Sequence, residues 1–226
     1  MALAMAVVFR RTLFIGVRAA VAKYIREVKE ASEPFDYHKE LMLWDFRKED
    51  VLQHWDCICD ADIDGHSWAK LERNKRGGAV FHGNLSTYCP PEAKRGGYAA
   101  IRSHQRKSTW YDHGCFDVSE YDALRLRVRG DGRKFFVNIQ NQSMVKDDDV
   151  WQFFMFTRGG PHWEDITIPL HNFFVTDRGT MQDVELQFSR ERVTTFGILL
   201  VDRINGPFSL EIEHIKAVRA FYLKKI

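Results

Sequence analysis

From Leu41 to near the C-terminus, the sequence consists of short runs rich in Val, Ile, Phe, Tyr and Trp, separated by clusters of Gly, Pro, Asn and Asp. Runs of this kind are typical of β-strands joined by turns. Ten of them are clear, at residues 42–46, 67–73, 79–88, 97–104, 122–129, 134–140, 151–157, 165–170, 195–201 and 209–219. This spacing predicts an all-β fold, a two-sheet sandwich of the jelly-roll type.

The strongest hairpin signal joins the runs 122–129 and 134–140. In the first run, apolar residues at 124, 126 and 128 alternate with arginines at 125, 127 and 129, which predicts one buried face and one solvated or partner-facing face. Gly130-Asp131-Gly132 then suits a tight turn, because Gly tolerates positive φ. Arg129-Gly130-Asp131 also spells an adhesion motif, but a tripeptide recurs by chance and the turn is the favoured interpretation. Arg158-Gly159-Gly160-Pro161 predicts a second connection of this kind.

The N-terminal segment has a different character. It carries basic residues but no Asp or Glu before Glu27, which is the composition of a mitochondrial transit peptide. We therefore predict two parts, a targeting or amphipathic helical segment at residues 1–33 and a β-sandwich domain at 34–226. On a helical wheel one side of the segment is apolar, and this partner or membrane face comprises Leu13, Phe14, Val17, Val21, Tyr24 and Val28. Two interpretations stay open: a cleaved address, or a helix that lies on a partner or a membrane surface.

Composition excludes several classes of protein. The chain has 226 residues, of which 45% are hydrophobic, so a core can support the fold without disulfides or metal ions. Its formal net charge of +2 does not indicate a nucleic-acid partner. No apolar stretch is long enough to predict a transmembrane helix.

One motif resembles a calcium loop. Asp60-x-Asp62-x-Asp64-Gly65 copies the opening of an EF-hand loop. The position that should carry the bidentate Glu is Leu71, and Glu72 arrives one residue late. A polar turn between strands is the favoured interpretation, with a calcium site of another kind as the alternative.

The cysteines give no clear metal or redox signature. His54, Cys57 and Cys59 form a loose group of potential zinc ligands, but the Cys-x-x-Cys spacing is missing. Reduced thiols are the favoured interpretation. We therefore predict no metal and no cofactor.

Catalytic signatures are missing as well. The sequence contains no Gly-x-Ser-x-Gly elbow, phosphate-binding loop, dinucleotide fingerprint or His-Glu-x-x-His. The prediction is a protein that is not an enzyme and has no catalytic residues.

Aromatic residues are more numerous than one buried face needs. They are Trp110-Tyr111, Trp151, Phe153-Phe154, Phe156, Trp163 and Phe173-Phe174. Most can fill a wide core, but aromatics at the loop rim of a sandwich also stack on sugar rings or anchor protein interfaces. A carbohydrate- or small-ligand-binding module is therefore the alternative function.

A series of motifs in order makes the assignment more specific. The series comprises Leu43-Trp44-x-Phe46, Gly83-x-Leu85-Ser86, the stretch 124–133, Val137-Asn138-Ile139, the stretch 154–163, Ile168-Pro169, Asp202 and Gly206-Pro207-Phe208-x-Leu210-Glu211-Ile212. Together they resemble the mitochondrial complex I intermediate-associated protein family over about residues 43–221.

The resemblance implies a galactose-binding-like jelly roll without enzymatic activity. It implies a factor in the biogenesis of respiratory complex I, acting like a chaperone through protein–protein interaction with membrane-arm subunits and other assembly factors. The implied location is the mitochondrial matrix, peripheral to the inner membrane that carries the respiratory chain. Retention as an accessory subunit of the NADH dehydrogenase complex is a variant of this prediction.

The resemblance carries no catalytic residues, so the site prediction is a binding surface. It falls on the two family-typical Gly-containing connections and comprises Arg129, Asp131, Arg133, Arg158 and Trp163. Arg and Trp are the side chains that contribute most to protein interfaces.

Overall fold

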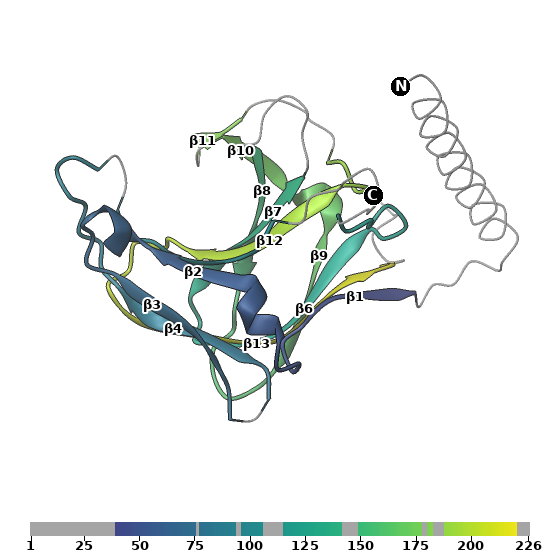
Figure 1. Cartoon of the computed structure of the whole chain (residues 1–226), viewed down its shortest axis with the longest axis horizontal. Helices are drawn as coiled ribbons and strands as arrows, with labels where there is room; N and C mark the ends of the chain where they lie inside the picture. The colour runs from purple at the N-terminus through teal and green to yellow at the C-terminus, as the bar shows by residue number, and fades with distance from the viewer. Residues whose placement is uncertain are drawn as a thin grey trace, which may run out of the picture. The chain divides into compact units, whose positions relative to one another are not determined.

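The computed structural model describes residues 39–75, 77–93, 96–105, 115–141, 149–177, 180–182 and 188–220. In these residues, antiparallel strands form two sheets that pack face to face (Figure 1). The all-β sandwich predicted from the sequence is therefore confirmed. The predicted N-terminal helix, with its apolar face from Leu13 to Val28, lies outside the described residues.

The first sheet, sheet A, has six strands. Its order is β3 (Trp68–Arg73), β4 (Ala79–Leu85), β13 (Gly206–Val218), β6 (Ala123–Gly130) and β9 (Glu164–Pro169), and β1 (Glu40–Asp45) also pairs with β13.

The second sheet, sheet B, has seven strands. Its order is β11 (Thr180–Met181), β10 (Phe174–Asp177), β8 (Asp149–Phe156), β7 (Lys134–Asn141), β12 (Val193–Leu200), β5 (Ala99–Ser103) and β2 (Trp55–Cys59). Short 3-10 helices η1 (Val51–His54), η2 (Asp60–Ile63) and η3 (Leu170–Asn172) occupy the connections. No helix of the described residues is long and apolar enough to cross a membrane.

The long strand β13 organises sheet A. Its first half, from Gly206 to Ile212, pairs with β4, and its second half pairs with β1 along the same edge. The register to β6 shifts between Ile212 and His214, which marks a β-bulge at Glu213. The extra residue explains why the polar and apolar residues of this run do not alternate cleanly.

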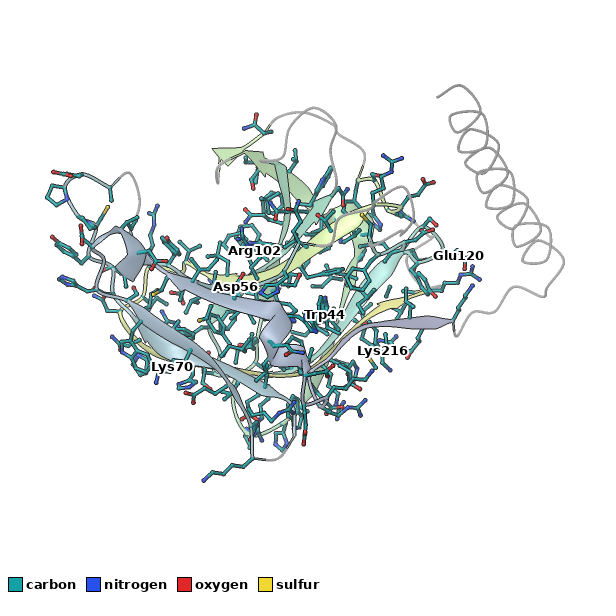
Figure 2. The ribbon with its side chains drawn as sticks, viewed as in Figure 1. Trp44, Asp56, Lys70, Arg102, Glu120 and Lys216 are labelled. Atoms are coloured by element: carbon teal, nitrogen blue, oxygen red, sulfur yellow. The ribbon has the colours of Figure 1, made fainter. Side chains whose placement is uncertain are left out.

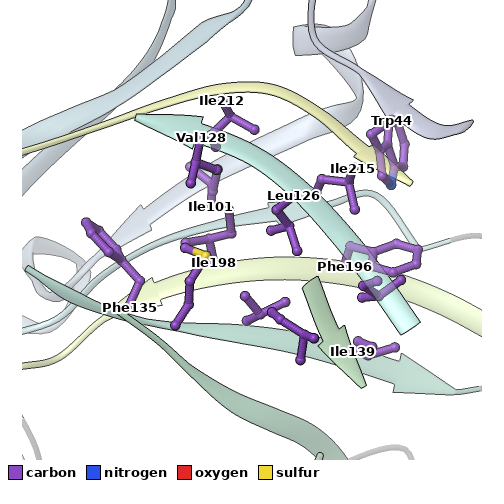
Figure 3. Close-up of a cluster of buried hydrophobic side chains, with 14 of the residues drawn as sticks. Trp44, Ile101, Leu126, Val128, Phe135, Ile139, Phe196, Ile198, Ile212 and Ile215 are labelled. Carbon is purple, nitrogen blue, oxygen red and sulfur yellow. The ribbon is translucent and has the colours of Figure 1, made fainter. Parts of the chain in front are cut away.

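The inner faces of the two sheets form the core. Phe81, Leu126 and Ile212 of sheet A are fully buried, as are Phe135 and Ile101 of sheet B. Figure 3 shows ten labelled members of this cluster between the sheets. At roughly 1.5–3 kcal/mol for each large side chain removed from water, this layer is the main source of stability.

The outer face of sheet A is a ladder of ion pairs. The arginines of β6 face acidic residues on neighbouring strands, as in the pairs Arg125–Glu40 at 2.6 Å and Arg127–Asp165 at 2.9 Å. Lys216 of β13 joins Glu40 at 2.8 Å, and Figure 2 shows it on the side of sheet A away from sheet B. The arginines of the face predicted from the alternation are therefore already paired with carboxylates of neighbouring strands.

All ten predicted runs overlap strands of the structure. Among the described residues, sequence analysis missed β2, β10 and β11, all of which belong to sheet B. β10 and β11 have four and two residues, too few to show an alternation, and β2 is a short edge strand that carries Asp56.

Candidate functional site

An open pocket lies beside the connection from β8 to β9. It has a volume of about 520 Å³ and is lined by Phe156, Thr157, Arg158, Trp163, Glu164, Asp165 and Ile166. The connection can turn sharply because Gly159 and Gly160 adopt φ of 74° and 89°, which disfavour other residues. Two of the predicted binding residues, Arg158 and Trp163, thus meet at one pocket.

Arg158 presents its guanidinium to solvent. Its side chain is 90% exposed, and its ion pair among the described residues is a long one, 3.9 Å from Nε to Glu164 Oε2. The backbone N–H of Arg158 donates to Glu164 Oε1 at 3.1 Å, and this bond fixes the loop while the side chain stays available. An exposed pair of this kind contributes little to stability, so Arg158 can exchange Glu164 for a partner's carboxylate at little cost.

Trp163 is half-buried, and Arg129 holds it from behind. The Arg129 guanidinium lies 5.3 Å from the centre of the Trp163 ring, within the range of a cation–π contact. Arg129 also pairs with Glu211 at 2.5 Å and donates from Nη1 to the Pro161 carbonyl at 3.2 Å. Arg129 therefore positions Trp163 and is not itself presented to a partner.

Arg133 is built into the fold. Its side chain is 9% exposed and makes a two-pronged pair with Asp202, at 2.8 Å from Nε and 2.6 Å from Nη2. Arg133 also donates to the carbonyls of Gly206 at 3.1 Å, Pro207 at 3.2 Å and Ile204. The pair therefore ties the β6–β7 turn to the β12–β13 loop.

Asp131 likewise serves the turn. Its carboxylate accepts from the backbone N–H groups of Arg133 at 3.0 Å and Ser209 at 2.7 Å. The tripeptide that resembles an adhesion motif is therefore a turn whose Asp and Arg bond to neighbouring strands. The five predicted binding residues thus divide into two groups. Arg158 and Trp163 form the exposed group, and Arg129, Asp131 and Arg133 form the supporting group.

The two loops of the site are locked together by Thr157. Its hydroxyl accepts from Gly132 N at 3.1 Å and donates to the Arg133 carbonyl at 3.0 Å. A Cβ on Gly130 would stand 2.4 Å from the Thr157 side chain, so only glycine fits there. The Thr157 hydroxyl, although it belongs to a pocket-lining residue, is therefore occupied in holding the turn.

The calcium-like motif folds into a closed loop. Asp60 is fully buried, and its carboxylate accepts from Ser67 N at 2.9 Å, Ser67 Oγ at 3.1 Å and Gly97 N at 2.6 Å. Gly65 leaves room for that carboxylate, because a Cβ there would lie 2.3 Å from Asp60 Cγ. These contacts support the polar turn, and the residues that the structure describes contain no cluster of three or more His, Cys, Asp or Glu suited to a metal.

The clear pKa shifts caused by burial lie away from the pocket. Burial raises the pKa of the Cys57 thiol to about 11, raises the pKa of the Tyr98 hydroxyl and lowers the pKa of His214. Cys57 belongs to β2, Tyr98 precedes β5 and His214 belongs to β13, and none of them lines the pocket. The pocket thus combines one exposed cation, one braced aromatic ring and two carboxylates, an arrangement suited to binding a surface of mixed charge.

Sequence reasoning missed Lys134. Its ammonium lies 5.6 Å from the centre of the Phe156 ring, next to the pocket. Phe156 is 60% exposed and Phe154 is 43% exposed. The aromatic surplus pointed to these two residues, but only the β7–β8 pairing places Lys134 beside them.

Comparison with known proteins gives a consistent family. The sequence model of "Complex I intermediate-associated protein 30 (CIA30)" matches residues 44–212. The protein named "Complex I intermediate-associated protein 30, mitochondrial" of Mus musculus is 34% identical over 180 residues, covering 77% of this chain and 55% of its own length. The protein of the same name from Drosophila melanogaster is 34% identical over 181 residues, covering 77% of this chain and 61% of its own length. The chain thus spans somewhat more than half the length of these curated relatives.

Solved structures share the fold. A family 11 carbohydrate-binding module from Clostridium thermocellum, solved with a β-1,3-1,4-mixed-linked tetrasaccharide, superposes with a TM-score of 0.55 at 18% identity. The match covers 82% of this chain and 98% of the module. At this identity the likeness establishes the β-sandwich alone.

Proposed function

Because this chain belongs to the Complex I intermediate-associated protein 30 family, we propose that it is a non-enzymatic binding protein that acts in the assembly of respiratory complex I. The observation that carries the proposal is the family match, which spans most of the β-sandwich. The geometry of the β8–β9 pocket agrees with it, since an exposed Arg beside a braced Trp is an arrangement typical of protein interfaces.

The proposed place of action is the mitochondrial matrix, at the surface of the inner membrane. The relatives are named mitochondrial, and the acid-free N-terminus of this chain has the composition of a mitochondrial address. The proposed partners are subunits of the membrane-arm intermediate and other assembly factors. A transient factor leaves when the arm is complete, whereas an accessory subunit remains.

The proposed contact surface is the β8–β9 pocket. Arg158 supplies a cation for an acidic group of the partner, and Trp163 supplies an aromatic anchor. Arg129 preorganises that anchor, so less side-chain freedom is lost on binding. Arg133 and Asp131 hold the loops in place and act only through the fold.

The test is to compare Arg158→Glu with Lys70→Glu in cells that depend on this protein. Both side chains are exposed, at 90% and 62%, so neither charge reversal should affect folding. We expect Arg158→Glu to reduce co-purification of complex I subunits about tenfold. The variant removes a cation from the interface and places a negative charge against the acidic group of the partner. Lys70→Glu lies on sheet A and should leave co-purification unchanged.

Trp163→Ala provides a second variant at the same pocket. It should weaken co-purification at least as much as Arg158→Glu, with the melting temperature recorded because Arg129 loses its cation–π contact. If both pocket variants recover complex I subunits as well as Lys70→Glu does, the pocket is not the contact surface.

A further inference from the structure

The outward face of sheet B carries a continuous apolar row. One residue from each of five neighbouring strands lies in it, and register joins them in the order Ile58, Ala100, Leu199, Phe136 and Phe154. Residues paired across strands point to the same face, and the next residue along each strand points to the core. All five are partly or largely exposed. The row is therefore an apolar strip open to solvent, opposite in character to the ion-pair ladder of sheet A.

Aromatic side chains cluster at one end of the row. The Phe136 and Phe154 rings lie 4.4 Å apart between centres, and Phe154 contacts Phe174 of β10 at 5.5 Å. Phe156 lies two residues beyond Phe154 on the same face and is 60% exposed. Large apolar side chains that gather on one exposed face mark interaction sites.

Unpaired cations border the row. Lys134 is exposed beside Phe156 and has no ion pair among the residues that the structure describes. Arg102 of β5 is also exposed without an ion pair in the described part of the chain, and Figure 2 shows it on the outward side of sheet B, next to Asp56. Asp56, which His104 contacts at 3.1 Å, is the acidic residue beside Arg102. Lys134 and Arg102 together outweigh this one carboxylate, and a net positive border favours an acidic occupant.

The dimensions of the strip fit a helix. Five strands about 4.8 Å apart give a row of about 19 Å, the length of roughly 13 helical residues. Figure 1 shows sheet B curving, with β10 and β11 rising on the side away from β13. Gly197 lies between Arg102 and Asn138 in the adjoining row, so this position adds no side chain beside the strip.

We propose that the outward face of sheet B is the docking site for an amphipathic helix of a partner protein, with the apolar side of the helix on the row from Ile58 to Phe154 and acidic residues along its polar flanks. This inference rests on the proposed function only in taking the chain to be a protein-binding factor. A bilayer fits less well because the sheet curves around its outward face. A sugar chain fits less well because the row itself is apolar, and the Asn138 and Gln152 amides in the adjoining row hydrogen-bond to each other at 3.0 Å.

Site-specific cross-linking tests the proposal. The full chain is produced in mitochondria with p-benzoylphenylalanine in place of Phe154 or Leu199, and in place of Trp68 as the control. Trp68 is an aromatic residue of sheet A that is 49% exposed. We expect cross-linked protein at positions 154 and 199 in at least fivefold higher yield than at 68, and mass spectrometry should map the linked peptide to an amphipathic helix with acidic flanks.

Two exposed substitutions give a second readout on the partner so identified. Phe154→Ser should weaken binding about tenfold, since it removes a large apolar contact. Lys134→Glu should weaken it at least threefold, and Lys70→Glu should not change it. Cross-links to phospholipid, to a glycan or to a non-helical segment, or protein cross-links no stronger than at position 68, would overturn the proposal. If the chain enters a complex I subassembly but forms none of these cross-links, this inference is refuted and the proposed function stands.

Discussion

Replacement of Arg133 by Met should be the most damaging single change near the site. The Arg133 and Asp202 side chains are only 9% and 3% exposed, so their two-pronged ion pair is well shielded from water. Without Arg133, the Asp202 carboxylate stays buried without its ion-pair partner, and three carbonyls of the β12–β13 loop and the start of β13 lose a donor. Breaking a buried pair from one side costs about 3–5 kcal/mol. For a domain of this size that corresponds to a fall in melting temperature of roughly 6–20 °C.

The assay is urea unfolding followed by tryptophan fluorescence, with circular dichroism as a second probe. The control is Arg47→Met, because Arg47 is 52% exposed and its pair with Asp45 should contribute less than about 1 kcal/mol. The double variant Arg133→Met, Asp202→Leu should be at least about 1 kcal/mol more stable than Arg133→Met alone, since the unpaired buried charge is gone. An Arg133→Met protein within 1 kcal/mol of the wild type, or a double variant no better than the single, would refute the reasoning.

Three further predictions concern other parts of the sandwich. The hydrogen bond from Lys216 holds the pKa of Glu40 below its ordinary value of 4.5, and the stability this confers is present above that pH and lost as pH falls through the native pKa. Glu40→Gln should therefore make the unfolding free energy fall less steeply on acidification below about pH 4.5; an unchanged slope would contradict the sign. Gly83→Ala places a Cβ 2.0 Å from the Trp68 carbonyl oxygen, so it should cost more than about 3 kcal/mol in urea unfolding; a smaller loss would mean that β3 shifts freely. The Cys57 thiol, with a pKa of about 11, should react with iodoacetamide about tenfold faster per pH unit across the range 8–10; a rate that levels off below pH 9 would show a lower pKa.

Strands whose apolar and polar residues alternate over a long run were the most predictable part of the fold. In β6 the alternation of Leu124, Leu126 and Val128 with arginines predicted the strand, its buried face and the turn that follows. β2 carries Cys-Ile-Cys between aspartates and gives no comparable alternation. It is a strand because β5 supplies its hydrogen bonds and its inward residues meet the core. Both contacts involve residues that are distant in sequence, so a short stretch of sequence does not reveal them.

In the candidate site, too, the sequence predicted local features but not contacts between residues distant in sequence. Glycines and Pro161 located the two loops correctly, because tight turns impose local demands on φ. The sequence did not distinguish Arg158, which is exposed, from Arg129 and Arg133, which are bound internally. Their partners Glu211 and Asp202 lie 82 and 69 residues away, and only the sheet register brings these charges together.

The central claim, a role in complex I assembly, is tested most directly by where the chain migrates in mitochondria. Solubilised mitochondria are separated on a native gel, and mass spectrometry quantifies the chain and the complex I subunits in each slice. We predict co-migration with a subassembly smaller than the mature complex, or a peak at the mature complex at near one-to-one stoichiometry if the chain is retained. Migration only as a free protein, with normal levels of complex I when the chain is depleted, would contradict the claim.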